Sequence, residues 1–190
     1  MDLAEAFHRR RMVRRFTGES IKPESAERIA SAAARAPTAG NAQGITVVSI
    51  TDSDRIAQIA EACGEHLYLK RGFDPWLSTA GQHIVLCAEP ERYRERYAEA
   101  DKDPATLDAI PWWWVDSGAA LMAVLLTAVE EGLAAGFHGG HGAAGVAEIL
   151  GIPAAVELVG IVAVGHPAPD RRSSSLDRPR RDDAVRREKW

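Results

Sequence analysis

Apolar residues recur along this chain at two different periods, and each period predicts a different kind of element. Helical spacing predicts a helix over residues 2–14, in which Arg10 and Arg14 would share one face. A second helix is predicted from Pro23 to about residue 35, because proline suits the first turn of a helix. Runs of β-branched and other apolar residues predict strands over residues 45–50, 83–88, 134–138 and 156–164.

The segments between these elements differ in polarity. Residues 52–63 and 146–150 are predicted to be helices, whereas residues 64–82 look irregular and residues 90–110 look like a polar surface helix and loop. The stretch from residue 111 to about 132 is apolar nearly all round, so we expect a helix that is buried on most sides. Helices and strands do not alternate strictly, which favours an α+β sandwich over a doubly wound sheet.

The composition is that of one ordinary soluble domain, spanning residues 1–190. Hydrophobic residues make up 46% of the chain and charged residues 26%. The net charge of −4 is unlike that of most nucleic-acid binders, so we expect no nucleic-acid partner. The longest strongly apolar run, residues 118–129, is too short to span a bilayer, so we expect no membrane partner.

The two cysteines, Cys63 and Cys87, stand apart from any CxxC pair or regular histidine spacing. We expect both to be buried structural thiols. The N-terminus has no secretory apolar region and the chain has no disulfide framework, so a reducing cytoplasm is the expected location.

Residues 10–16, the arginine segment, read Arg-Arg-Met-Val-Arg-Arg-Phe. Several guanidinium groups this close together in the sequence are suited to binding a phosphate through two-pronged hydrogen bonds. The alternative is a solvated basic helix face with no ligand.

Residues 37–43, the amide loop, read Pro-Thr-Ala-Gly-Asn-Ala-Gln between a predicted helix and a predicted strand. The amides of Asn41 and Gln43 on such a turn could read the polar edge of a flat heterocycle. The alternative is a loop whose Pro, Gly and Asn residues only end the helix.

Residues 139–145, the glycine loop, contain a formal GxGxxG over residues 140–145. A dinucleotide-binding fingerprint should follow the first strand of a βαβ unit and lead to an acidic residue after the next strand. Neither condition is met here, so that interpretation is disfavoured. His138 and His141 lack further ligands in a metal-binding pattern, so no metal is expected.

These stretches together resemble the FMN-dependent nitroreductase family over nearly the whole chain. The family pattern Arg-Arg-Ser-x-Arg-x-Phe matches the arginine segment, except that Met12 replaces the serine and removes a hydroxyl donor. The family's Ala-Pro-Ser-x-x-Asn-x-Gln loop matches the amide loop, and its last basic motif resembles residues 178–181, which could otherwise be a disordered tail. The resemblance implies that FMN is bound by Arg10, Arg11, Met12, Arg14, Pro37, Thr38, Asn41, Gln43, Gly139, Gly140, Arg178 and Arg180.

The same resemblance implies a fold and an assembly. It implies a nitroreductase-like α-β-α sandwich with a central, mostly antiparallel sheet flanked by helices. It also implies a homodimer with FMN at the subunit interface, in which residues 168–190 form an extension that packs on the partner subunit.

The activity implied is that of an FMN-dependent oxidoreductase. NAD(P)H would reduce FMN and leave, and a flat small-molecule acceptor of the nitroaromatic or quinone type would then bind, in ping-pong fashion. The cofactor would carry the chemistry, so no catalytic side chain is assigned. Trp112, Trp113 and Phe73 are candidates to stack on the substrate. Two alternatives stay open: a specialised relative, such as a dehydrogenase, dehalogenase or flavin-fragmenting enzyme, and a flavin-binding protein without activity.

Overall fold

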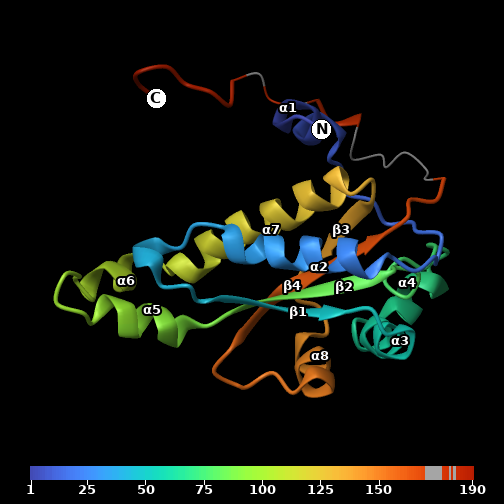
Figure 1. Ribbon diagram of the computed structural model, residues 1–190, viewed down its shortest axis with the longest axis horizontal. Helices are drawn as coiled ribbons and strands as arrows, with labels where there is room; N and C mark the ends of the chain where they lie inside the picture. Colours follow the sequence, from blue (N-terminus) through green and yellow to red (C-terminus); the bar gives the residue numbers. More distant parts are fainter. Residues whose placement is uncertain (170–176, 180, 182) are drawn as a thin grey trace.

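A single antiparallel sheet organises the molecule (Figure 1). The computed structural model describes residues 1–169, 177–179, 181 and 183–190. Within this part the strands lie in the order β1-β2-β4-β3. Their bounds are β1 (Ile45–Ile50), β2 (Gln82–Ala88), β3 (Ala134–His138) and β4 (Glu157–Gly165). Each strand lies within one residue of its predicted position, and the predicted α+β sandwich with an antiparallel sheet is confirmed.

Helices cover both faces of the sheet (Figure 1). One layer holds α2 (Pro23–Ala32) and the long α7 (Trp112–Glu130), and the other holds α3 (Ser53–Ala62) and α8 (Ala143–Leu150). The remaining helices lie at the ends of the sandwich: α1 (Leu3–Arg9), α4 (Glu65–Lys70), α5 (Pro90–Tyr97) and α6 (Ala105–Ala109). Short 3-10 turns occupy residues 33–35 (η1) and 39–41 (η2).

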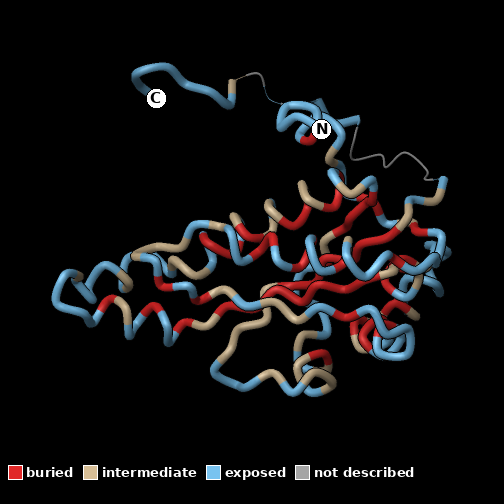
Figure 2. Tube along the Cα trace, in the orientation of Figure 1, coloured by how far each residue is buried: buried red, intermediate tan, exposed pale blue. Residues whose placement is uncertain are grey.

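The central strand β2 separates two hydrophobic cores, and every one of its residues is buried (Figure 2). Ile84 and Leu86 pack in the core beneath α2 and α7. Val85 and Cys87 point the other way, into the core that contains residues of α3 and α8. Because side chains alternate across a strand, a strand covered on both faces needs an unbroken apolar run, which is what residues 84–88 supply.

The first helix is shorter than predicted. It ends at Arg9, and the prediction that Arg10 and Arg14 share a helix face is wrong. The arginine segment instead runs beside the sheet, where Met12 bridges to Ala135 of β3. Val13 and Phe16 enter the core on this course, and their burial outweighs the modest helical preference of the segment.

Residues 64–82 are more regular than predicted, because they include the short helix α4. The cysteines match their prediction: Cys63 and Cys87 are both buried and free. Burial raises the pKa of each thiol to about 11, so both stay protonated and unreactive at neutral pH.

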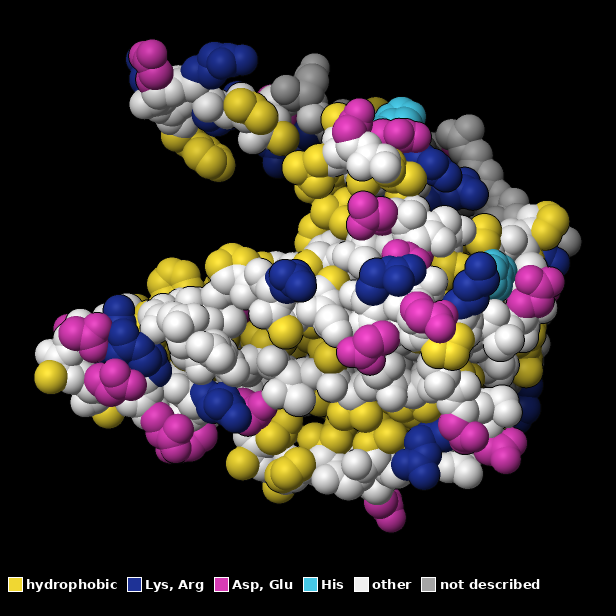
Figure 3. Space-filling model, viewed as in Figure 1, with side chains coloured by type: hydrophobic (Ala, Val, Ile, Leu, Met, Phe, Trp, Pro, Cys, Tyr) yellow, Lys and Arg dark blue, Asp and Glu magenta, His cyan; other side chains and the backbone are white. Residues whose placement is uncertain are grey.

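Helix α7 is less buried in the single chain than predicted, because a strip along its first three turns is exposed. Its length and apolar composition would allow it to cross a membrane, but a third of that window is buried against the rest of the protein. Trp114, Val115 and Met122 remain exposed on its outer face. Figure 3 shows hydrophobic side chains along the edge of the body that faces the outstretched C-terminal segment.

Candidate functional site

The arginines near the N-terminus fall into two groups. Arg9 pairs with Glu5 at 3.4 Å, and Arg15 pairs with Asp74 at 3.6 Å. In the part of the chain that the structure describes, no carboxylate pairs with the other three arginines: Arg10, Arg11 and Arg14. Three unpaired guanidinium groups on one short segment are chemically suited to an anionic ligand, because each offers donors in a rigid fork.

The course of the arginine segment spreads these groups along the edge of the sheet. The Val13 N–H donates to the Ala135 carbonyl oxygen at 2.9 Å, which fixes the segment beside β3. A Cβ on Gly136 would overlap the Val13 carbonyl oxygen, so glycine is required there for this close approach. Arg11 lines a cavity of about 410 Å³ with His8 and Arg9, over an apolar floor.

Arg14 lies against the aromatic ring of Trp76. Its guanidinium carbon lies 5.5 Å from the ring centroid of Trp76, a cation–π arrangement. Trp76 is only 5% exposed. Its ring centroid is 6.0 Å from that of His138, the last residue of β3. Arg14, Trp76 and the start of the glycine loop therefore belong to one neighbourhood.

A buried carboxylate holds the backbone around Trp76. Glu65, at the start of α4, accepts hydrogen bonds from the backbone N–H groups of Trp76 at 2.7 Å and Leu77 at 2.6 Å, and also from that of Ser78. The Leu77 carbonyl oxygen in turn accepts a hydrogen bond from Nε2 of His83 at 2.9 Å. The backbone N–H groups of residues 76–78 are therefore bonded to Glu65, and the Leu77 carbonyl oxygen is bonded to His83. Together these bonds fix the position of the Trp76 indole.

His83 should make the stability of the protein depend on pH. It is fully buried on β2, and its Nδ1 has no hydrogen-bond partner among the described residues. Burial lowers the pKa of His83 to about 4, although the Leu77 carbonyl opposes the shift. Between the ordinary pKa of about 6.5 and this value, the unfolded chain binds a proton that the native protein does not. The free energy of unfolding should therefore fall as the pH is lowered through this window.

Between neutral pH and about pH 5, His83 alone is expected to lower the free energy of unfolding by about 2 kcal/mol. Urea unfolding of the native protein and of His83→Gln at both pH values measures it. Glutamine can still donate to the Leu77 carbonyl but does not titrate, so its curve should lose less stability on acidification. Equal losses in the two proteins would show that His83 is not responsible.

The glycine loop is folded back on itself after β3. The His141 N–H donates to the Gly139 carbonyl oxygen at 2.8 Å, and Nε2 of His138 lies 3.0 Å from the His141 carbonyl oxygen. Gly140 has φ +66° and open space where a Cβ would stand. A planar ligand could therefore approach the backbone closely at this point.

The amide loop lies at the opposite edge of the sheet, directly before β1. Asn41 (φ 57°) and Gln43 (φ 52°) both adopt the left-handed conformation. Such a conformation costs roughly 1–2 kcal/mol for each non-glycine residue, so the surrounding structure must hold both residues in place. One support is internal, because the Thr38 hydroxyl oxygen accepts from the Gln43 N–H at 3.0 Å.

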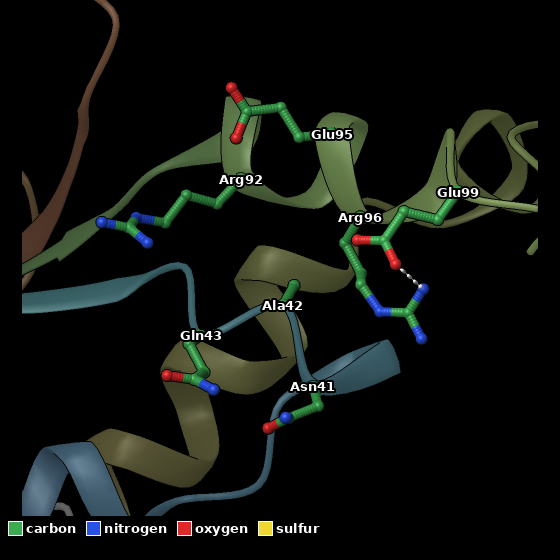
Figure 4. Close-up of a pocket in the computed structure, with 7 residues that line it drawn as sticks. All are labelled: Asn41, Ala42, Gln43, Arg92, Glu95, Arg96 and Glu99. Carbon is green, nitrogen blue, oxygen red and sulfur yellow. Dashed lines mark hydrogen bonds and ion pairs between the residues drawn. The ribbon is translucent and has the colours of Figure 1, made fainter.

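Asn41 and Gln43 line a polar cavity of about 270 Å³ between the amide loop and α5 (Figure 4). Each of the two arginines that line this cavity is paired with an acidic side chain. Arg96 forms a two-pronged hydrogen bond with Asp101 at 2.7 and 2.9 Å, and Arg92 pairs with Glu89 at 3.0 Å. The paired charges make this cavity a poor anion site, so its distinctive feature is the pair of amides.

Other predicted site residues are scattered. Trp112 and Trp113 begin α7, where the Trp113 indole N–H donates to Glu157 at 3.0 Å. Phe73 is 61% exposed and lies beside Tyr68 of α4. Helix α4 lies at the far end of the sandwich from the start of α7 (Figure 1). Arg178 is exposed, and Arg180 lies outside the described residues.

A single chain therefore assembles one half of the predicted site and leaves the other half apart. The arginine segment runs beside β3, and the glycine loop, which includes Gly139 and Gly140, follows the end of that strand. Arg14 connects the two through Trp76 and His138. The amide loop, with Pro37, is separated from them by β2 and β4. Sequence reasoning missed Glu65, and it missed Asp116, which is described below. For Asp116 a signal existed, since it is an isolated acid near the start of a long apolar helix.

Comparison with known proteins places these features in context. A sequence profile described as "Nitroreductase family" matches residues 8–166. A protein of Archaeoglobus fulgidus named "Putative NADH dehydrogenase/NAD(P)H nitroreductase" is 27% identical over 185 residues, covering 95% of this chain and 94% of the relative. The "NADPH-flavin oxidoreductase" of Vibrio harveyi is 28% identical over 159 residues, covering 83% of this chain and 62% of the relative.

Solved structures show the same fold. An "FMN-dependent Nitroreductase" from Clostridium difficile superposes with a TM-score of 0.73 at 16% identity, covering 99% of this chain and all of that one. A nitroreductase A from Vibrio parahaemolyticus gives a TM-score of 0.72 at 24% identity, covering 98% of this chain and 75% of that one. At these identities the likeness establishes the architecture of the chain.

Proposed function

The chain belongs to the nitroreductase family, and from this premise we propose that it is an FMN-dependent oxidoreductase that uses NAD(P)H to reduce a flat acceptor. The acceptor class proposed is nitroaromatic or quinone. The observation that carries the proposal is that Arg10, Arg11 and Arg14 have no carboxylate partner among the described residues. Their segment runs beside β3, the strand that leads into the open, left-handed Gly140. Relatives named for NAD(P)H and flavin chemistry support the choice of donor and cofactor.

The residues present fit FMN. Arg10, Arg11 and Arg14 would bind its phosphate, since no carboxylate among the described residues neutralises them. Met12 offers only backbone groups, because its thioether is not a hydroxyl donor. In the C-terminal segment Arg178 would add a further cation, and Arg180 is proposed for the same role from its sequence position alone. The open backbone at Gly140 would receive the ring.

The amides of Asn41 and Gln43 complete this site only if a second copy of the chain supplies them. We therefore propose a homodimer with one site at each interface. The exposed apolar face of α7 and the fully exposed Trp190 support it, because both are surfaces that a partner subunit would cover. Residues 168–190 are proposed to pack on that partner.

Bound FMN would supply the redox chemistry, taking hydride from NAD(P)H and passing the electrons to the acceptor in alternating fashion. The chain would bind, orient and shield the ring. The Asn41 and Gln43 side chains would hold its polar edge, and Trp76 with Arg14 would exclude water from one side. Trp112, Trp113 and Phe73 are proposed to stack on the acceptor, and a dimer could bring them together from different subunits.

Titration of the flavin-free protein with FMN, monitored by absorbance, tests the proposal. We expect the flavin band to shift on binding, with one FMN per chain, and the complex to have a mass of twice 20.6 kDa by light scattering. Anaerobic NADH or NADPH should then bleach the bound flavin. A protein that takes up no FMN would refute the proposal. Flavin that binds but is reduced by neither nucleotide would favour a specialised relative with another reaction.

A further inference from the structure

Asp116 is the only charged residue of α7 before Glu130, and it is buried, with 7% exposure. One carboxylate oxygen, Oδ2, accepts two hydrogen bonds. The Ala39 backbone N–H donates at 2.8 Å, and the Tyr93 hydroxyl donates at 2.7 Å. A buried carboxylate is costly unless it is hydrogen-bonded, so a side chain that served only packing in this apolar helix would be aliphatic. The presence of Asp116 at this position therefore indicates a role in holding the amide loop, to which it is hydrogen-bonded.

The bond to Ala39 lies where the amide loop turns. Ala39 begins the 3-10 turn η2, and Thr38 before it makes no side-chain capping bond to that turn. Asp116, from a helix that is distant in sequence, satisfies the N–H group that a local cap would satisfy. The left-handed residues Gly40, Asn41 and Gln43 follow immediately.

Helix α5 closes the same loop from its other side. Nε of Arg96 donates to the Gly40 carbonyl oxygen at 2.8 Å, and Asp101 fixes that guanidinium with two hydrogen bonds. The ring of Tyr93 covers Gly44, where a Cβ would lie 2.8 Å from Cδ2. Tyr93 itself is fully buried, so its hydroxyl can be satisfied only inside the protein.

We propose that Asp116 is the positioning residue of the amide loop, holding Asn41 and Gln43 in their left-handed conformation so that they can bind the flavin ring. The inference rests on the proposed function for the identity of the ligand. The geometry of the clamp itself, which links α7, α5 and the loop through Ala39, Tyr93 and Asp116, does not depend on it. Asp116 does not reach the ring, and it acts through the loop.

Two measurements on the full chain test this role. The first is the FMN dissociation constant of Asp116→Ala, which we expect to rise about 10- to 100-fold, by analogy with the loss when a group that orients metal ligands is removed. The second is hydrogen exchange of peptides covering residues 36–44 without flavin, which should accelerate while β2 and β4 keep their protection. Asp116→Asn keeps an oxygen at the same place and should restore the affinity to within about threefold of the native protein.

Ser117→Ala is the matched control. Ser117 is the next residue on α7, is buried, and hydrogen-bonds within its own helix, from Oγ to the Trp113 carbonyl oxygen at 2.6 Å. It should alter stability but leave both the FMN affinity and the exchange of residues 36–44 unchanged. If Asp116→Ala does not fold, Asp116→Leu keeps the volume without the acceptor and should give the same two results.

Native affinity and native loop exchange in Asp116→Ala or Asp116→Leu would overturn the inference. An equal loss of affinity in Ser117→Ala would also overturn it, because the effect would then come from α7 in general. If the native protein binds no FMN, the proposed function fails. The exchange of residues 36–44 still decides whether Asp116 holds the loop.

Discussion

Replacing both Arg10 and Arg14 by alanine is expected to weaken FMN binding by at least about 100-fold. Each guanidinium would make charge-assisted hydrogen bonds worth about 1.5–3 kcal/mol, so two lost contacts amount to about 3–6 kcal/mol. Because about 1.4 kcal/mol corresponds to a factor of ten, the loss lies between two and four orders of magnitude. Titration of the flavin-free variant, followed by quenching of flavin fluorescence, gives the dissociation constant.

Arg15→Ala supplies the control for net charge. It removes the same kind of charge from the same segment, but its guanidinium is already paired with Asp74. Its FMN affinity should stay within about threefold of the native value, since an exposed ion pair contributes little. A double variant that binds FMN as tightly as Arg15→Ala would show that the arginine segment does not hold the phosphate.

Gly142→Ala is expected to cause the largest loss of stability that we predict. Gly142 has φ +78°, and a Cβ there would overlap the Ala62 carbonyl oxygen and lie 2.9 Å from the Cα of Cys63. Both neighbours are backbone atoms at the end of α3, so no side chain can move aside. The left-handed conformation costs about 1–2 kcal/mol and the overlap about 1–3 kcal/mol, giving a total of about 2–5 kcal/mol.

Urea unfolding measures this loss of stability. A second variant, Gly151→Ala, separates the conformational cost from the cost of the steric overlap. Gly151 caps α8 with φ +64° and has open space where a Cβ would stand, so alanine there should bear only the conformational cost of about 1–2 kcal/mol. If the two substitutions lower the free energy of unfolding equally, contact between the glycine loop and α3 is not tight.

Much of the fold could be predicted because its elements have strong local signals. The apolar run that forms β2 is unbroken, and Pro23 and Asp52 mark the starts of α2 and α3. The first helix was predicted too long because the position of Val13 depends on its bond to Ala135, more than 100 residues away. The exposure of α7 was missed for a related reason, since an apolar pattern cannot say whether one chain or two will bury it.

The candidate site was predictable in residue type but not in arrangement. The density of arginines identified a candidate anion site, yet the separation of paired from unpaired arginines came from Glu5 and Asp74, whose positions only the fold defines. The role of Trp76 depends on Glu65, through bonds to backbone groups that leave no trace in the sequence. The left-handed conformation of Gln43 is likewise a tertiary property, because glutamine has no special preference for it.

The strand order has a consequence for how the protein is made. Strand β4 lies between β2 and β3, both of which leave the ribosome before it. Until residues 157–165 emerge, β3 has only the arginine segment beside it, and β2 has β1 on one side only. The nascent chain must therefore carry its most deeply buried strand incompletely covered until residues 157–165 have been synthesised, and a chain in that state is exposed to aggregation.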